Sequence, residues 1–322
     1  MIAEIRVGDV REQMAGIADA SVQCVVTSPP YWGLRDYGHE DQIGLEQTPQ
    51  EYIDQMVEVF REVKRILKDD GTLWLNIGDS YASFRDGKAT PDTARGESEG
   101  TLVPKGQAKN RSASSFAGTQ IKHKDLVGIP WRLAFALQAD GWYLRQDIIW
   151  HKPNPMPESV TDRCTKSHEY VFLLSKSNKY FFDHAAIKEP SKNLGVTNIR
   201  FGGSKYGDSD DPKHATKSGN VYTDSGLRNK RDVWTINTKP FGGAHFAVMP
   251  EALAEPCILA GSRKGDVVFD PFTGSGTTAV VALRHERSFV GVELNAEYAK
   301  IAAQRIDADG PMFNEVRIHE QT

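Results

Sequence analysis

Residues 266–294, "DVVFDPFTGSGTTAVVALRHERSFVGVEL", combine an apolar strand, a glycine-rich loop, a helix and a second apolar strand. Residues 295–306 follow with apolar residues at helical spacing, so the stretch predicts a strand–helix–strand–helix unit. A glycine loop between a strand and a helix is typical of sheets that bind nucleotides at the carboxyl ends of their strands. The stretch therefore predicts an α/β fold.

Earlier segments of the chain show the same alternation. Strands are expected at residues 22–28, 72–77, 143–152 and 168–176, and a helix at residues 130–141. Because strands alternate with helices, we expect a mostly parallel, doubly wound sheet that is covered on both faces.

The clearest helix signal begins at Thr48. Thr48 is a typical N-cap, Pro49 suits the first helical position, and Glu51 completes a capping box. Apolar residues then repeat at helical spacing as far as Leu67, and Gly71 is expected to end the helix.

The composition is that of an ordinary globular protein. The chain has 322 residues, of which 39% are hydrophobic and 25% are charged. No apolar run approaches 18 residues and the first residues do not form a signal peptide, so we expect a cytoplasmic protein without a membrane partner. The three cysteines, Cys24, Cys164 and Cys257, are isolated and predict neither disulfides nor a metal site.

Positive charge is concentrated in two polar segments. Residues 85–124 contain 8 Lys/Arg and 4 Asp/Glu, and residues 188–232 contain 9 and 6. The remaining chain has 22 basic and 33 acidic residues. This distribution suits two insertions that contact a polyanion, although solvated loops would explain the charge equally well.

Three ligands compete for the glycine loop. ATP is disfavoured because no lysine follows the glycines, whereas Gly274, Gly276 and Ala279 formally fit a dinucleotide motif. Glu293 ends the next strand, where an acid can accept hydrogen bonds from ribose hydroxyls. Asp270 beside the loop would repel a pyrophosphate, which favours S-adenosylmethionine because this ligand carries a sulfonium and an ammonium group.

The stretch "CVVTSPPYW", residues 24–32, predicts a buried strand that ends in prolines and aromatic rings. An exocyclic amino group of a base is a poor nucleophile, because its lone pair is delocalised into the ring. The Ser28 hydroxyl and the Pro29 carbonyl can accept hydrogen bonds from such a group, and Tyr31 can stack on a base extruded from a duplex. The motif thus suits direct methyl transfer by positioning.

Together, "TSPPYW" at 27–32 and "DPFTGSGTT" at 270–278 resemble the amino-group DNA methyltransferases, which modify cytosine N4 or adenine N6. The catalytic motif precedes the cofactor motif, as in the β class of that family. Residues 8–10, 147–159 and 245–258 resemble further segments of these enzymes.

The resemblance implies a Rossmann-like methyltransferase fold in circularly permuted motif order, S-adenosyl-L-methionine as cofactor and double-stranded DNA as partner. A homodimer and a cognate restriction endonuclease are further expected partners, in a bacterial or phage setting. It divides the chain into a catalytic half (1–82 and 125–187), a flexible polar insertion (83–124), a target-recognition segment (188–232), a cofactor-binding half (233–310) and a C-terminal tail (311–322).

The resemblance also assigns residues to three roles. Those expected in catalysis are Ser28, Pro29, Pro30 and Tyr31. Those expected to bind the cofactor are Asp9, Asp270, Phe272, Gly274, Ser275, Gly276, Thr277, Glu293, Leu294 and His245. Those expected on the side of the target base are Trp32, Trp150, Lys152 and Asn154.

The base itself is suggested by Ser28. In the family, serine at this position with an aromatic pair favours cytosine N4, whereas aspartate favours adenine N6, so we expect cytosine N4 and keep adenine N6 as the alternative. A methyltransferase acting on RNA or protein glutamine, and a dehydrogenase or non-catalytic DNA-binding module, are more remote. Cys257 follows a proline as in cytosine-C5 enzymes, but its helical apolar setting predicts a core cysteine.

Overall fold

The computed structural model describes residues 1–34, 42–82, 119–191, 197–200, 220–223, 226–238, 248–310 and 314–319. The chain divides into two compact units. The larger comprises Met1–Phe182 and Asp232–Thr322, and the smaller comprises Asp183–Arg231.

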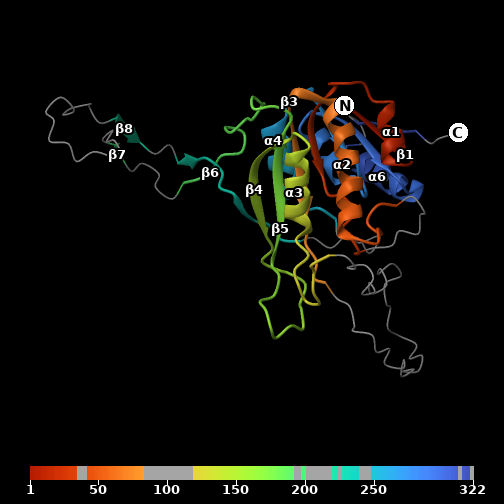
Figure 1. Cartoon of the computed structure of the whole chain (residues 1–322). Coiled ribbons are helices and arrows are strands. Elements are labelled where there is room, and N and C mark those ends of the chain that lie inside the picture. The colour runs from red at the N-terminus through yellow and green to blue at the C-terminus, as the bar shows by residue number, and fades with distance from the viewer. Residues whose placement is uncertain are drawn as a thin grey trace, which may run out of the picture. The chain divides into compact units, whose positions relative to one another are not determined.

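The larger unit contains a central sheet with helices beside it (Figure 1). In the described residues this sheet has nine strands, in the order β10-β4-β5-β3-β2-β11-β12-β1-β13. Neighbouring strands pair in parallel, except that β5 is antiparallel to both β3 and β4. The mostly parallel sheet is therefore confirmed. Its strands are β1 (Ile2–Val7), β2 (Val22–Thr27), β3 (Leu67–Ile77), β4 (Tyr143–His151), β5 (His168–Ser175), β10 (Val233–Thr235), β11 (Val267–Asp270), β12 (Ser288–Glu293) and β13 (Glu315–His319).

Two groups of helices cover the sheet. One group packs α2 against α1 and α3, and the other packs α5 against α4 and α6. Strand β2 separates them: Val25 belongs to the core under the first group, and the Cys24 sulfur lies 3.8 Å from the Cys257 carbonyl oxygen of α4. The helices are α1 (Val10–Ala15), α2 (Pro49–Ile66), α3 (Ile129–Ala139), α4 (Glu251–Gly261), α5 (Thr277–Arg284) and α6 (Ala296–Asp309).

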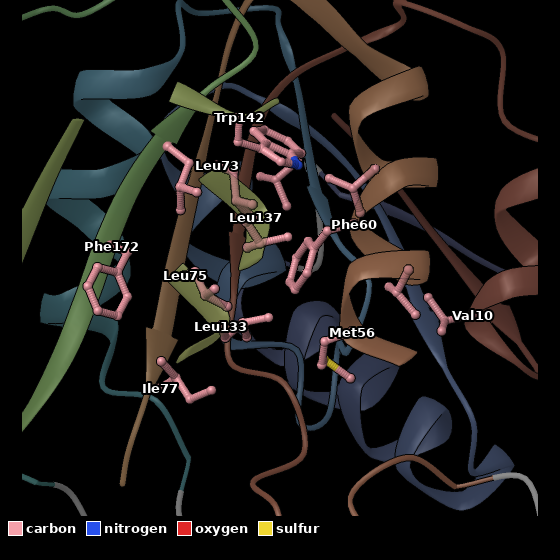
Figure 2. Close-up of a cluster of buried hydrophobic side chains, with 14 of the residues drawn as sticks. Val10, Met56, Phe60, Leu73, Leu75, Ile77, Leu133, Leu137, Trp142 and Phe172 are labelled. Atoms are coloured by element: carbon pink, nitrogen blue, oxygen red, sulfur yellow. The ribbon is translucent and has the colours of Figure 1, made fainter. Parts of the chain in front are cut away.

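The core between α2, α3 and the sheet is a continuous apolar cluster (Figure 2). Phe60 from α2 and Leu137 from α3 point toward Leu73 and Leu75 of β3. All four side chains are fully buried. The helical spacing of α2 creates this apolar face, and the predicted capping box at Thr48 and Glu51 is confirmed.

The permuted order of the motifs places a late strand of the chain beside an early one. Strand β11, from the last quarter of the chain, pairs in parallel with β2, with Val268 opposite Cys24 and Phe269 opposite Val25. The loops that follow these two strands therefore leave the same edge of the sheet as neighbours.

The expected end of the helix at Gly71 was wrong. Helix α2 ends at Ile66 and the chain enters β3 at once, so Gly71 lies inside a strand rather than after a helix. The register shifts near it, and a Cβ on Gly71 would lie 2.5 Å from Leu67 Cγ. A glycine is thus required by an irregularity in the strand pairing.

The predicted C-terminal tail contains a strand. Within 311–322, β13 pairs in parallel with β1 at the end of the sheet, with Ala3 opposite Val316 and Ile5 opposite Ile318. The alternation in "EVRIH" was too short to predict this edge strand, and its partner β1 was not predicted either.

The smaller unit corresponds closely to the segment predicted at 188–232. It contains two antiparallel strand pairs, β6 (Glu189–Pro190) with β9 (Leu227–Arg228) and β7 (Thr197–Arg200) with β8 (Asn220–Thr223). Within it, Glu189 accepts hydrogen bonds from Arg228 and Arg231. Most of the insertion predicted at 83–124 lies outside the described residues, so its flexibility stays a prediction.

No helix in the described residues has the length and apolar character needed to span a membrane. The cytoplasmic location stays a prediction.

The core predicts a clear difference between two phenylalanines. Phe60 is fully buried, whereas Phe135 of α3 is 55% exposed. Phe60→Ala should lower the free energy of unfolding by about 3–5 kcal/mol because it leaves a cavity, and Phe135→Ala should lower it by about 1 kcal/mol or less. Urea unfolding followed by circular dichroism measures both, and equal losses would contradict this description of the core.

Candidate active site

The loop after β2 and the loop after β11 line one cavity of about 280 Å³. Their neighbouring positions follow from the parallel pairing of the two strands. The loop after β1 and the end of β12 contribute to the same wall, and β4 and β5 contribute Trp150 and Glu169. The cavity is thus built from the carboxyl ends of several strands, where open α/β sheets bind ligands.

Most of the predicted site residues line this cavity. Those assigned to catalysis are all present: Ser28, Pro29, Pro30 and Tyr31. Those assigned to the cofactor are present with two exceptions: Asp9, Asp270, Phe272, Gly274, Ser275, Thr277, Glu293 and Leu294 line the cavity. Of those assigned to the target base, Trp150 and Lys152 line it.

Four predicted residues are placed elsewhere or not described. Trp32 is 3% exposed in the hydrophobic core, and its indole donates to the Glu46 carbonyl at 3.1 Å, so it is a packing residue. Gly276 caps α5 at a φ of +76°, where a Cβ would lie 3.0 Å from Ala302 Cβ. Asn154 lies outside the cavity lining and exchanges hydrogen bonds with the backbone of Thr238. His245 lies outside the described residues.

Asp270 has a structural role that was not expected, while its predicted contact with the cofactor stays a prediction. Its carboxylate accepts hydrogen bonds from the Thr27 hydroxyl at 2.7 Å, the Thr278 hydroxyl at 2.8 Å and the Phe272 amide at 3.0 Å. Burial raises the pKa of Asp270 to about 6, although these donors oppose the shift. The carboxylate fastens the glycine loop to the end of β2, and this structural role was not visible in the sequence.

Glu293 lies across the loop from Asp270. It accepts hydrogen bonds from the Gly274 amide at 2.8 Å and the Asn295 amide at 3.0 Å. Burial, opposed by these amides and assisted by the negative charge of Asp270, raises the pKa of Glu293 to about 7. The carboxylate therefore changes its charge near neutral pH in the free protein.

The charge of the cavity fits a cationic ligand. Four carboxylates line it, from Asp9, Glu169, Asp270 and Glu293, and Lys152 is the one cation among the described lining residues. Lys152 is paired with Glu169. A pyrophosphate would meet no free positive charge among these residues, whereas a sulfonium and an ammonium group suit the acidic wall. The residues present thus fit S-adenosylmethionine better than a dinucleotide.

The catalytic loop presents acceptors to the cavity. The Tyr52 hydroxyl of α2 donates to the Pro30 carbonyl at 2.9 Å, which holds the loop against the core. Among the described residues, no donor bonds to the carbonyl of Pro29, a cavity-lining residue that cannot join a sheet ladder through its own nitrogen. Ser28 is half-buried beside it.

Two polar cavity residues beside Tyr31, Asn76 and Glu169, were not found from the sequence. Asn76 is the penultimate residue of β3 and Glu169 is the second residue of β5. Both reach Tyr31: the Tyr31 hydroxyl donates to Glu169 at 2.7 Å and lies 3.5 Å from Asn76 Oδ1. A polar residue at the carboxyl end of an apolar strand was the available signal for Asn76. Glu169 lies on the antiparallel strand, so only its pairing with β3 and β4 reveals its position.

A family model described as "DNA methylase", for N6 and N4 amino-methyltransferases, matches residues 22–304. The chain belongs to this family. The cofactor of this family is S-adenosylmethionine and its substrate is DNA.

Curated relatives agree with this assignment. The methyltransferase is 51% identical to the type II methyltransferase M.SmaI of Serratia marcescens, over 94% of this chain and 90% of the relative. It is 47% identical to the type II methyltransferase M.Cfr9I of Citrobacter freundii, over 97% and 89%.

Solved structures share the fold. A putative DNA modification methylase from Thermus thermophilus, crystallised with S-adenosyl-L-methionine, is 25% identical, with a TM-score of 0.60 over 99% of both chains. The PvuII DNA methyltransferase, described as cytosine-N4-specific, is 18% identical, with a TM-score of 0.61 over 98% of this chain and 94% of that one. The predicted Rossmann-like methyltransferase fold is therefore confirmed.

Two other chemistries find no support among the described residues. No group of three or more histidine, cysteine or acidic side chains there can hold a metal ion. Cys257 is 1% exposed in α4 and its thiol donates to the Leu253 carbonyl at 3.2 Å. It is a core cysteine, as predicted, and not a nucleophile of the cytosine-C5 type.

Glu293 predicts a pH dependence of cofactor binding. Its pKa of about 7 means that it is protonated at pH 6 and ionised at pH 8. The ionised form has more acceptors and attracts a cationic ligand, so the Kd for S-adenosylmethionine should fall about tenfold from pH 6 to pH 8.

Isothermal titration calorimetry measures this change. Glu293→Gln is the control, because it removes the titrating group while the ionisation of the ligand itself remains. The same pH dependence in both proteins would exclude Glu293 as its source.

Proposed function

We propose that this methyltransferase transfers the methyl group of S-adenosylmethionine to the exocyclic amino group of a base flipped out of duplex DNA, and that the base is cytosine, at N4. The observation that carries the proposal is the presence of Ser28 and Pro29 in the same cavity as the glycine loop. Adenine N6 is the alternative, since either amino group needs similar acceptors.

Two groups of the protein position the target amino group. The Ser28 hydroxyl and the Pro29 carbonyl accept hydrogen bonds from the two N–H bonds of the target amino group. These contacts draw the nitrogen towards a tetrahedral geometry and localise its lone pair. The bound cofactor supplies an electrophilic methyl group, and no covalent intermediate with the protein is required.

Aromatic groups of the cavity suit a flipped base. Tyr31 is half-buried in the cavity wall, and Trp150 is fixed by a hydrogen bond from its indole to the Ile236 carbonyl at 2.9 Å. A base that has left its stack regains stacking energy against such rings. The preference for cytosine rests on Ser28 followed by the aromatic pair Tyr31 and Trp32.

We further propose that the smaller unit, Asp183–Arg231, recognises the target sequence. The excess of basic residues at 188–232 supports contact with phosphates. The type II relatives also support a cognate restriction endonuclease as partner. The expected homodimer stays a prediction.

The base is identified by labelling. Duplex DNA incubated with tritiated S-adenosylmethionine and the protein is digested to nucleosides and separated by chromatography. Label in N4-methylcytosine supports the proposal, whereas label in N6-methyladenine establishes the alternative. Label in added RNA or protein, but not in DNA, would contradict both.

Ser28→Ala tests the catalytic role. Loss of one oriented acceptor should lower kcat on the order of 100-fold, while the Kd for S-adenosylmethionine stays within about twofold because Ser28 does not belong to the glycine loop. Single-turnover methylation and calorimetry measure the two quantities. Full activity in this variant would exclude Ser28 as an acceptor.

A further inference from the structure

Behind Ser28, three side chains form a hydrogen-bond chain. The Ser28 hydroxyl lies 3.4 Å from the Tyr31 hydroxyl oxygen, and the Tyr31 hydroxyl donates to Glu169 Oε2 at 2.7 Å. All three residues line the active-site cavity. The chain thus runs from the proposed acceptor of the target amino group into the wall of the cavity.

At the far end of this hydrogen-bond chain, Glu169 can only accept hydrogen bonds. Glu169 Oε1 is paired with Lys152, and the Glu169 and Lys152 side chains are only 15% and 18% exposed. Lys152 also lies over the Trp150 ring, with Nζ 4.2 Å from the ring centroid. Asn76 Nδ2 approaches Glu169 Oε2 at 3.3 Å. With donors at both oxygens, the carboxylate acts only as a hydrogen-bond acceptor.

An acceptor at one end fixes the direction of every donor in the chain. The single Tyr31 proton is used by Glu169, so the Tyr31 oxygen offers lone pairs to Ser28. The Ser28 proton then points to Tyr31, and the Ser28 lone pairs are left for the cavity. Burial and the adjacent charge of Glu169 raise the pKa of Tyr31 well above its usual value, which keeps its proton in place.

We propose that Glu169, held by Lys152, is a positioning residue that orients the Ser28 hydroxyl through Tyr31, so that Ser28 accepts rather than donates a hydrogen bond at the target amino group. A serine hydroxyl can do either, and one that donated would withdraw its acceptor from the substrate. This inference rests on the proposed amino-group methylation and adds a residue to it.

Glu169→Gln reverses the direction of the hydrogen bond to Tyr31 and leaves the size of the side chain almost unchanged. Lys152 selects the amide oxygen of the new side chain, so the amide nitrogen faces Tyr31 and donates to it. Tyr31 must then donate elsewhere, and Ser28 loses its oriented partner. The single-turnover methylation rate should fall on the order of 100-fold, comparable to the loss of one oriented active-site group.

Tyr31→Phe separates this role from a purely structural one. The variant removes the link in the chain, so Ser28 rotates freely and the rate should fall about tenfold. Glu169→Gln should then cause no further loss in the Tyr31→Phe background, because it acts through the Tyr31 hydroxyl. The Kd for S-adenosylmethionine should stay unchanged in all three proteins.

Asp140→Asn is the matched control. Asp140 also has a 15% exposed side chain and also accepts from a cation, Arg61 Nε at 2.7 Å, but it does not line the cavity. It should retain the wild-type methylation rate. If Glu169→Gln does not fold, as judged by its thermal unfolding, Tyr31→Phe decides alone: it should lose about tenfold in the wild type and nothing more in Ser28→Ala.

Three results would overturn the inference. These are a wild-type rate in Glu169→Gln, an equal loss from Glu169→Gln in both backgrounds, and a loss from Tyr31→Phe that persists in Ser28→Ala. A wild-type protein that labels no DNA amino group would instead contradict the proposed function, and the inference with it.

Discussion

The Thr27 hydroxyl donates a hydrogen bond to the Asp270 carboxylate, and these two residues are 243 positions apart in the sequence. This contact lies at the carboxyl ends of β2 and β11, which pair in parallel directly before it. Asp270 also accepts from Thr278 and Phe272, so one buried carboxylate holds the catalytic strand and both sides of the glycine loop. The cavity exists because these two strands are neighbours.

Buried carboxylates need hydrogen-bond donors, and in this cavity the donors come from the loops that line it. Asp270 and Glu293 both have raised pKa values because burial disfavours their charged forms. Donors of the glycine loop offset the cost of burying each carboxylate. These hydrogen bonds fix the loop in place before a ligand binds. The Glu169 carboxylate has different partners: it is paired with Lys152 and accepts a hydrogen bond from the Tyr31 hydroxyl. The cavity therefore combines four carboxylates, from Asp9, Glu169, Asp270 and Glu293, with the hydroxyl of Ser28.

Sequence patterns and the family resemblance predicted much of the fold, and most of the residues that they assigned to the site line the cavity. The spacing of apolar residues in α2 and the glycine loop after β11 depend on neighbours in sequence, and both were correct. Failures occurred where a residue's role depends on distant partners. Gly71 looked like a helix stop, but the pairing of β3 with β2 places it inside a strand. Trp32 looked like a pocket residue, but its indole reaches the Glu46 carbonyl in the core. The sequence also did not show that the close approach of Ala302 in α6 requires the lack of a side chain at Gly276, whose predicted contact with the cofactor stays a prediction.

In the proposed function, the loop after β2 and the loop after β11 act on one substrate atom. A crystal structure of the protein with S-adenosylhomocysteine and a duplex containing its target site would show whether they do. We predict the ribose hydroxyls at Glu293, and the amino nitrogen of the flipped base within hydrogen-bond distance of Ser28 Oγ and the Pro29 carbonyl oxygen. A base amino group bound away from both acceptors, with the cofactor in the same cavity, would contradict the account.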